Sequence, residues 1–594
     1  MNRHNTPPRC EALEPRVLLS ADLEVTILSA TGPAVVVPGD KGTIKVRIKN
    51  VGDVASVGKV DTYVCASSDT TFDWSDPRLG SVLAKPVNLA PGKSITETIA
   101  GVLPDSVTPG TYHMLAYIWM TPSSSNNASG NDTAVVGGTT EVKWQFGNVG
   151  GRSNVKLTLH DGALDPVVFT LTGPGTGTIV RGAGGLPSDT VSTLGTTGAS
   201  TLTISTPKGT TTTLKNIQVL GDAGPGSGAI KSISAPTVDL MTGVSVDGVI
   251  SKLALDEILS AGHSISLNAS LGAVPSGSSV AITAYVINDC TVATHGLPIK
   301  SFTAALVSGL DLTAPWMGTM TVSSKDGGWG NLDGTIALNG TSPAAKSLGK
   351  LTASGNLNSL ALTAAGAVGD IKARNWAAGS LSAPVTHSIT MAGGLAADVT
   401  GDVGAVTTGY NMTGTWNCHH LGKVKVGANL TNATFNFLGA GGLTDNVLES
   451  LSVHNLISSC TITSNNSIGS ISALGIENSN FLLGVGGTAM PTGVGQFEAA
   501  HTSRIKSLTI SGYSDITFNP VASFINTKIS AWRIDKISLA YADTTNATTF
   551  GFAAHSIGKA TYVPLSGGAS TTWGPMIHAS DSVTIDQMVF RILE

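Results

Sequence analysis

The hexapeptide IKSISA, from Ile230 to Ala235, decides the fold of this chain, because its apolar-x-x-apolar-x-apolar pattern returns throughout the last two-thirds of the sequence. The other copies are LKNIQV from Leu214, ISKLAL from Ile250, IKSFTA from Ile299, LGKLTA from Leu348, VGDIKA from Val368, LGKVKV from Leu421, LESLSV from Leu448, IGSISA from Ile468, IKSLTI from Ile505 and IDKISL from Ile534. Several neighbouring copies begin 20 residues apart, and each of two gaps of 49 residues is long enough to hide a degenerate copy. A repeat of this length predicts stacked coils, each of which buries its apolar face against the next.

Two repeat architectures fit this pattern, because leucine-rich repeats also use L-x-x-L-x-L with a period of roughly 20–29 residues. The segments that follow the copies, such as TSNNS and GYSDITFNP, are rich in Thr, Gly and Asn and lack helical periodicity. The sequence therefore favours a parallel β-helix (a β-solenoid) over residues 229–594. Its fourth and sixth pattern residues should face inward, the first should turn a corner of the coil, and the second and third should face solvent.

The ends of such a stack need covering, because an unpaired strand edge invites pairing with another chain. Residues 143–228 are β-rich and very low in charge, and we expect them to form a lead-in or capping region. We expect the irregular tail from Ile557 onward to cap the other end.

The composition indicates an all-β protein of more than one unit. A chain of 594 residues is too long for one compact core. Charged residues make up 12%, hydrophobic residues make up 41%, and 71 glycines mark a turn-rich chain. The formal net charge is -5 with no basic cluster, which argues against nucleic-acid binding. No apolar stretch approaches the ~20 residues of a membrane helix, so we expect no transmembrane segment.

The cysteines do not suggest a disulfide framework or a zinc module. They are odd in number and irregularly spaced, at Cys10, Cys65, Cys290, Cys418 and Cys460. We therefore expect buried thiols. Cys418-His419-His420 is the one metal-like cluster, but adjacent strand residues point to opposite faces, so one metal ion would not easily use all three.

Residues 22–142 read as a separate domain. Runs such as GTIKVRIKNVG and GTYHMLAYIWM alternate apolar and polar residues, and Gly, Pro and Asp turns separate them at intervals of about 8–12 residues or more. This pattern and a length of about 120 residues predict an immunoglobulin-like β-sandwich.

The same region resembles the cell-adhesion-related domain of bacteria, CARDB. The stretches that carry the resemblance follow the family's order: Asn50-Val51-Gly52, then Asp69, Asp73 and Asp76 before Leu79-Gly80, then Leu89-Ala90-Pro91-Gly92, Pro109-Gly110-Thr111-Tyr112 and Asn126-Asn127. Serines replace the acidic residue that often precedes the Asn pair. The resemblance implies an adhesion-type module.

Residues 1–21 contain a second resemblance. Leu13-Glu14-Pro15-Arg16 and Leu18-Leu19, followed by Ser-Ala-Asp, resemble the LEPR-XLL motif at the start of large, repetitive proteins of planctomycetes and some proteobacteria. The motif covers about 4% of the chain. It implies an exported or envelope-associated bacterial protein, with residues 1–21 as a disordered export or sorting segment.

Asp69, Asp73 and Asp76 form the densest carboxylate group in the chain. Three oxygen donors in one loop are suited to Ca²⁺, with backbone carbonyls and water completing its roughly 6–8 ligands. Asp also caps ordinary turns through local hydrogen bonds, and the spacing does not follow the EF-hand. We keep these residues as a candidate calcium site and expect no other cofactor.

Some parallel β-helices are polysaccharide lyases or hydrolases, which need carboxylates on neighbouring coils together with Ca²⁺ or a basic residue. The nearest candidates are Asp370 with Arg374, Asp326 with Asp333, Asp398 with Asp402, and Asp256 with Glu257. None recurs one coil later with a carboxylate at matching phase, so we interpret them as solvated turn residues and predict no enzyme. Candidate sugar platforms are Trp316, Trp329, Trp376 and Trp416, although aromatic residues more often pack inside such repeats.

The sequence thus predicts a secreted or cell-surface structural and adhesion protein of a bacterium. Its partners would be envelope or matrix components, including polysaccharide. The alternatives are a polysaccharide-active β-helix enzyme, which predicts a groove lined by coil-adjacent carboxylates, and a non-catalytic carbohydrate-binding protein, which predicts a row of exposed Trp or Tyr along the repeats.

Overall fold

The structure is a computed structural model that describes residues 21–121, 133–135, 139–222, 227–258, 262–323, 330–439, 446–499, 501–546 and 548–594. Several residues discussed above lie outside these ranges, namely Cys10, Leu13 to Leu19, Asn126, Asn127, Asp326 and Trp329. The described chain is all-β, as expected, and its helices are three short 3₁₀ turns, η1 (Leu186–Ser188), η2 (Val494–Gln496) and η3 (Ala579–Asp581). None of the described helices is long and apolar enough to cross a bilayer.

The chain divides into two compact units. The first comprises Met1–Val180 with Leu202–Thr210, and the second comprises Arg181–Thr201 with Thr211–Glu594.

The first unit begins with two sheets that enclose a hydrophobic core, and their strands pair antiparallel except for the short parallel pairing of β2 with β9. One sheet has the order β1-β3-β6 and the other β2-β9-β7-β4-β5, with β8 beside β7. The strands are β1 (Leu23–Thr31), β2 (Val35–Val36), β3 (Lys41–Asn50), β4 (Ser56–Ser67), β5 (Arg78–Leu89), β6 (Ser94–Val102), β7 (Gly110–Thr121), β8 (Thr133–Val135) and β9 (Thr140–Val142). Their alternation buries every second residue, for example Val46 and Ile48 from one sheet with Val64 and Ile118 from the other.

Short strands follow within the same unit, β10 (Gln145–Val149), β11 (Arg152–His160), β12 (Pro166–Thr172) and β13 (Thr176–Val180), and they pair antiparallel. Two polar contacts join them to the sheets before them. The indole N–H of Trp144 donates to the Val107 carbonyl at 2.9 Å. The guanidinium of Arg152 forms an ion pair with Asp40 at 2.8 Å.

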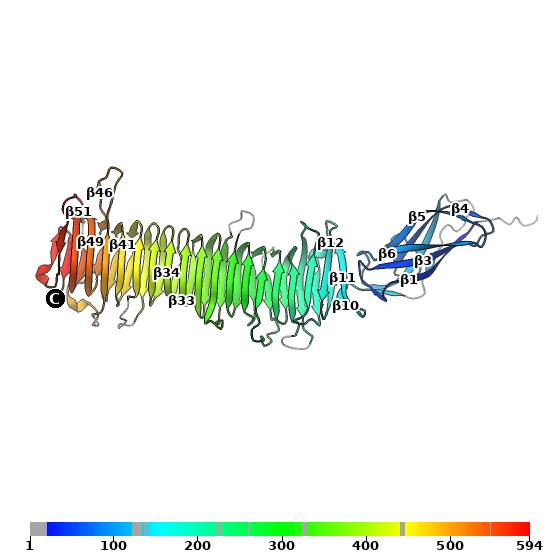
Figure 1. Cartoon of the computed structure of the whole chain (residues 1–594), viewed down its shortest axis with the longest axis horizontal. Coiled ribbons are helices and arrows are strands. Elements are labelled where there is room, and N and C mark those ends of the chain that lie inside the picture. Colours follow the sequence, from blue (N-terminus) through cyan, green and yellow to red (C-terminus); the bar gives the residue numbers. More distant parts are fainter. Residues whose placement is uncertain are drawn as a thin grey trace, which may run out of the picture. The chain divides into compact units, whose positions relative to one another are not determined.

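The second unit is a ladder of parallel strands in which each turn of the chain, here called a coil, pairs with the next one (Figure 1). The hexapeptide copy from Leu214 lies in β16 (Thr212–Leu220), which pairs with β18 (Val238–Val246). The other ten copies form a different column of this ladder. Its strands are β17 (Ile230–Ala235), β19 (Ile250–Leu255), β22 (Val280–Thr283), β25 (Ile299–Ala304), β27 (Met317–Val322), β29 (Lys346–Ala353), β31 (Ala367–Ala373), β33 (Gly379–Met391), β34 (Asp398–Thr408), β36 (Leu421–Val426), β38 (Leu448–Val453), β41 (Ile468–Ala473), β44 (Arg504–Ile510), β49 (Arg533–Ala542) and β51 (Ser556–Pro564). Equivalent residues pair directly, as Ile230 does with Ile250 and Leu448 with Ile468.

Degenerate copies fill the two long gaps in the repeat. Val280 pairs with Ile299, and Met317 pairs with Leu348, so β22 and β27 each supply the missing coil. The expectation drawn from the gap lengths is confirmed.

Burial follows the hexapeptide pattern. In every copy that the sequence identified, the fourth and sixth residues are buried, as predicted, and the first residue is buried as well. The expectation that the second residue faces solvent holds for Lys231 but is wrong for Gly369, Gly422 and Gly469, which are buried. A Cβ at any of these three glycines would overlap a backbone carbonyl oxygen of the preceding coil. These positions are glycine because neighbouring coils approach too closely for a side chain.

The remaining segments of each coil are also strands in the described residues, and α-helices are absent there, so they do not match the helical returns of a leucine-rich repeat. These strands are β14 (Thr190–Leu194), β15 (Thr201–Ser205), β16 (Thr212–Leu220), β18 (Val238–Val246), β20 (Glu257–Ile258), β21 (His263–Leu267), β23 (Val286–Asn288), β24 (Cys290–Ala293), β26 (Leu306–Ala314), β28 (Leu332–Leu338), β30 (Asn356–Ala364), β32 (Asn375–Trp376), β35 (Met412–Cys418), β37 (Leu430–Phe437), β39 (Leu456–Ser458), β40 (Thr461–Ser464), β42 (Gly475–Glu477), β43 (Asn480–Leu483), β47 (Phe524–Ile525), β48 (Lys528–Ser530) and β50 (Phe550–Ala554), with β45 (Tyr513–Ser514) and β46 (Pro520–Val521) forming a separate hairpin. Inside the last coils, Phe552 stacks between Phe524 at 5.2 Å and Phe590 at 5.0 Å.

The C-terminal tail covers both strand edges at its end of the ladder. Strand β51 pairs antiparallel with β52 (Thr571–Trp573). Strand β54 (Met588–Ile592) pairs parallel with β50 and antiparallel with β53 (Val583–Ile585). This arrangement agrees with a capping role for the tail, but the cap begins after Pro564 and not at Ile557, because β51 pairs parallel with β49 as a further strand of the ladder.

We predict that Gly422→Ala destabilises the ladder. The added methyl group would meet the Gly404 carbonyl oxygen, so two coils would have to separate locally, at a cost on the order of 1–3 kcal/mol. Differential scanning calorimetry should show a melting temperature several degrees lower. Gly487→Ala is the matched control, because no atom lies within 4 Å of a Cβ at Gly487. Equal melting temperatures for the two variants would contradict the packing explanation.

We also predict that deletion of residues 565–594 causes oligomerisation, because it removes β52, β53 and β54 and leaves the edges of β51 and β50 unpaired. Light scattering after size-exclusion chromatography measures the mass. Phe590→Ala is the control, since it removes a buried side chain and keeps every strand. A truncated chain that stays monomeric and soluble would refute the capping role.

Candidate functional site

The loop between β4 and β5 holds the three aspartates of the candidate calcium site. Each of them fixes a turn of the loop. The Oδ1 of Asp69 accepts from the Thr71 N–H at 2.6 Å, and the Oδ1 of Asp73 accepts from the Ser75 N–H at 2.7 Å. The Oδ2 of Asp76 accepts from the Asp73 N–H at 2.9 Å. Hydrogen bonds from the backbone and side chain of Ser75 hold the pKa of Asp73 below its ordinary value.

These hydrogen bonds are the ordinary turn chemistry of Asp. In the part of the chain that the structure describes, no three His, Cys, Asp or Glu side chains gather as a metal site. Calcium binding by Asp69, Asp73 and Asp76 stays a prediction.

The four described cysteines are free and buried, as expected. Burial raises the thiol pKa to about 11 for Cys65 and Cys460 and to about 12 for Cys290 and Cys418. Such thiols remain protonated at neutral pH and are poor nucleophiles and poor metal ligands.

The Cys418-His419-His420 cluster is divided between the core and the surface. Cys418 is 1% exposed, whereas the backbone N–H groups of His419 and His420 both donate to Oδ1 of Asp402 at 2.8 Å. Asp398 binds the next coil in the same way, accepting from the Thr415 N–H at 2.7 Å. The pair Asp398 and Asp402 therefore joins neighbouring coils through the backbone.

Asp370, named with Arg374 as a candidate pair and interpreted as a solvated turn residue, contacts two residues of the next coil. Its Oδ1 lies 2.8 Å from Nδ1 of His387 and accepts from the Ser388 hydroxyl at 2.5 Å. These hydrogen bonds, first that of Ser388 and then that of His387, lower the pKa of Asp370. Because the hydroxyl donates to the carboxylate, it is not poised to give its proton to the imidazole as a serine nucleophile would.

Asp256 and Glu257 have a carboxylate neighbour on the preceding coil, which the sequence interpretation missed. Leu240 pairs with Ile258, so Asp239 lies beside Glu257. Burial, followed by the charges of Asp256 and Glu257, raises the pKa of Asp239 to about 6. The buried Oδ1 of Asp239 has no hydrogen-bond partner among the described residues. The sequence interpretation compared each candidate only with the following coil and therefore missed this neighbour, for which the 18-residue offset between Asp239 and Glu257 was the available signal.

The tryptophans that were candidate sugar platforms are mostly inside the ladder, in agreement with the expectation that aromatic residues pack inside such repeats. Trp376 and Trp416 are fully buried, and Trp416 stacks on Phe435 with centroids 6.1 Å apart. Trp316 is half-buried. Trp376 and Trp416 therefore belong to the core, and the expected row of exposed aromatics does not include them.

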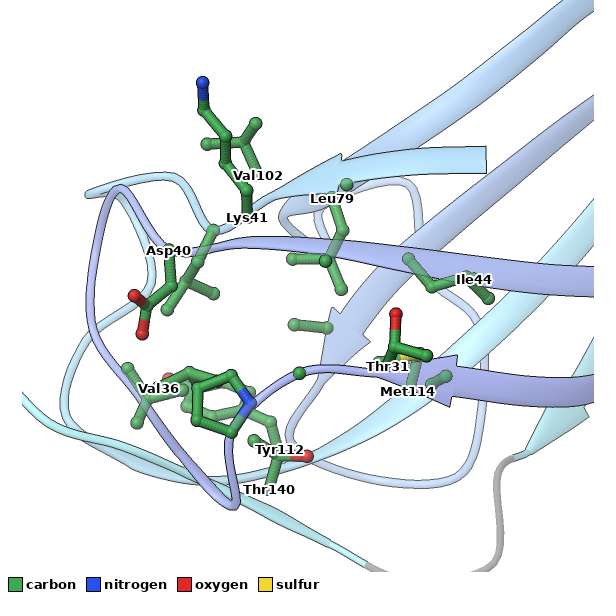
Figure 2. A pocket seen from close by; sticks show the side chains of 18 of the residues that line it. Thr31, Val36, Asp40, Lys41, Ile44, Leu79, Val102, Tyr112, Met114 and Thr140 are labelled. Carbon is green, nitrogen blue, oxygen red and sulfur yellow. The ribbon is translucent and has the colours of Figure 1, made fainter. Parts of the chain in front are cut away.

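The first unit contains an apolar cavity of about 160 Å³ at one end of its two sheets. Ile44, Leu79 and Met114 converge on it, while the amino group of Lys41 points away (Figure 2). Asp40 at its rim is already paired with Arg152. A cavity of this size and character suits a small apolar group, and its lining supplies no nucleophile with an adjacent base.

Comparisons with known proteins give partial similarities. No protein-family model and no curated protein matches the chain. Among solved structures, the CARDB domain of a Pyrococcus furiosus protein in complex with di-metal ions is 19% identical, covers 21% of this chain and 94% of its own, and has a TM-score of 0.15. A Listeria innocua β-glucosidase in complex with glucose is 16% identical over 20% of this chain and 16% of its own, with a TM-score of 0.14. The Bacillus subtilis sporulation control protein Spo0M is 10% identical over 28% of this chain and 76% of its own, with a TM-score of 0.15. The solved structures similar to this chain thus include a CARDB domain, over about a fifth of its length.

We predict that Asp239→Asn stabilises the protein at neutral pH. The pKa of Asp239 is raised from 3.8 to about 6, so the folded state binds more protons than the unfolded state between these values, and stability falls as the pH rises through this window. After allowance for solvent screening, removing the charge should stabilise by about 1 kcal/mol at pH 7.5. The melting temperature should therefore rise at pH 7.5 and stay equal to that of the wild type below about pH 4. Glu449→Gln, at an exposed carboxylate of the same ladder, should change neither value. A pH-independent effect of Asp239→Asn would count against the electrostatic cause.

Proposed function

We propose that this chain is a secreted or cell-surface structural and adhesion protein of a bacterium. In this proposal the ladder is a parallel β-helix that serves as a stalk, and residues 22–142 form a CARDB-like, immunoglobulin-like module. The protein acts by extended surface contact with envelope or matrix components and performs no catalysis.

One observation carries the proposal. The ladder continues in register from β17 to β51, and most of its candidate carboxylates bind backbone or side chains of a neighbouring coil. Residues used in this way contribute to the stability of a repetitive structure. The sequence resemblances, LEPR-XLL in residues 1–21 and CARDB in residues 22–142, support an extracellular setting by analogy.

A second candidate, a polysaccharide-active enzyme, is favoured by Asp239 and Glu257. Glycoside hydrolysis uses two carboxyl groups, one of them with a raised pKa as the general acid. Asp239 has such a pKa, and Glu257 lies beside it on the next coil. If the protein cleaves a polysaccharide, Asp239 and Glu257 are the residues that would do so. The structural proposal assigns them no reaction.

The experiment that tests the location is fractionation of the native host cell, followed by protease treatment of intact cells. We expect the protein in the envelope fraction or the medium, and we expect added protease to degrade the envelope-bound form because that form is exposed. A cytosolic marker protein must remain intact in the same samples. Recovery of the chain in the cytosol, protected from protease, would overturn the proposal.

Catalysis is tested separately by measuring release of reducing or unsaturated sugars from a panel of polysaccharides. We expect no release. Release that disappears in both Asp239→Asn and Glu257→Gln would replace the structural assignment with the enzymatic one.

A further inference from the structure

Four aromatic residues form a cluster on the first unit, outside its hydrophobic core. Tyr63 of β4 and Tyr117 of β7 are direct partners in the sheet, with ring centroids 6.4 Å apart. They lie on the face opposite to the core residues Val64 and Ile118. The loop between β4 and β5 adds Phe72 and Trp74 over them.

The cluster is layered, and Trp74 is its outermost member. Phe72 stacks flat on Tyr117, with centroids 4.1 Å apart and planes 4° apart, and this leaves Tyr117 only 2% exposed. The indole of Trp74 stands nearly perpendicular to both rings, at 5.1 Å from Phe72 and 5.5 Å from Tyr117. Contacts at these distances bring the edges of both rings against one indole face. Trp74 is 63% exposed, so its opposite face is open to solvent.

The loop that carries Trp74 is held in shape by its own hydrogen bonds. The turns made by Asp69, Asp73 and Asp76 lie on both sides of Trp74 in the sequence. On the sheet below, the guanidinium of Arg78 lies 4.4 Å from the ring centroid of Tyr63. A ring fixed before binding loses little conformational entropy when a ligand stacks on it.

A second indole extends the same sheet face. Trp119 follows Tyr117 by two residues, so it projects to the same side of β7, and it is 41% exposed. Its partner in the sheet is Asp61, which receives a hydrogen bond from the Ala84 N–H at 2.6 Å. The face therefore presents two exposed indoles and carboxylates around them.

The combination of exposed indoles and nearby carboxylates favours one class of ligand over others. A protein partner would have to desolvate the exposed carboxylates of Asp69 and Asp73, and the centre of a protein interface is usually depleted of charge. An anionic polymer would be repelled by the same groups. A neutral sugar ring offers weakly positive C–H groups to the indole face and hydroxyl donors to the carboxylates.

We propose that Trp74 and Trp119 form a binding site for neutral polysaccharide on the outer face of the β4–β7 sheet. Trp74 provides the main stacking platform, Trp119 takes a second sugar ring along the chain, and Asp69 and Asp73 accept hydroxyl hydrogen bonds. The proposed function leaves the ligand class open, whereas this inference specifies neutral polysaccharide. The inference does not depend on the cellular location of the protein.

The test is affinity gel electrophoresis of the full-length protein in native gels containing laminarin, glucomannan, galactomannan or alginate. We expect at least one of the three neutral polysaccharides to retard the wild type, and alginate to leave its mobility unchanged. Trp74→Ala should weaken binding by about tenfold or more, as loss of an exposed aromatic anchor does. Trp119→Ala should weaken it less, and Trp74→Phe should retain part of it.

Tyr410→Ala is the matched control, because Tyr410 is 67% exposed on the second unit and lies in no aromatic contact with the cluster. Melting temperatures equal to that of the wild type would verify that the variants are folded. The inference is overturned if none of the neutral polysaccharides is bound, if alginate alone is bound, or if Trp74→Ala binds as the wild type does. Glycan binding by a protein found in the cytosol would overturn only the proposed function, and surface location without glycan binding would overturn only this inference.

Discussion

Parallel pairing in register between successive coils is the constraint on which the ladder depends. Strands pair about 4.8 Å apart, so every residue lies over its equivalent one coil away. Leu351 lies over Ile371, and Val424 lies over Leu451. Aliphatic residues stacked in this way form one continuous interior. The same closeness requires glycine wherever the backbone of one coil would meet a Cβ of the next.

The register also determines which polar side chains can stack on one another from coil to coil. An amide carries both a donor and an acceptor, so amides can bond to one another from coil to coil. Asn375 donates to Asn356, and Asn436 donates to Asn417, each at 2.9 Å. Burial, followed by repulsion from the neighbouring carboxylates of Asp256 and Glu257, raises the pKa of Asp239, and this arrangement is unfavourable for stability at neutral pH. A costly pair of this kind is a reason to examine a site for function.

The first unit has two different surfaces that could accept a ligand, an apolar cavity and an outer face with an aromatic cluster. The aspartates of the β4–β5 loop accept backbone hydrogen bonds and thereby hold the loop that carries Trp74. The apolar cavity near Leu79 lies between the two sheets, whereas the aromatic cluster lies on an outer sheet face. A polar, pre-shaped surface and a small apolar cavity suit different ligands, and the surface has the larger exposed aromatic area.

Local pattern by itself determined the all-β class, the inward positions of the repeat, the burial of the cysteines and the existence of the hidden coils at Val280 and Met317. These features depend on alternation along one strand and on a period that stacking preserves. The candidate sites were predicted less well. The sequence offered Asp370 with Arg374 as a candidate charged pair and interpreted both as solvated turn residues, whereas Asp370 contacts His387 and Ser388. The burial of Trp376 and Trp416 agrees with the expectation that aromatic residues pack inside such repeats.

Only the tertiary structure decided which distant side chains meet. Asp239 reaches Glu257 because that coil is 18 residues long, while the clearest repeats are 20. Tyr63 meets Tyr117 because β4 and β7 pair antiparallel across 54 residues of sequence. The physical reason is that apolar periodicity specifies which face of a strand is buried, whereas coil length, loop conformation and strand partner specify what lies beside it.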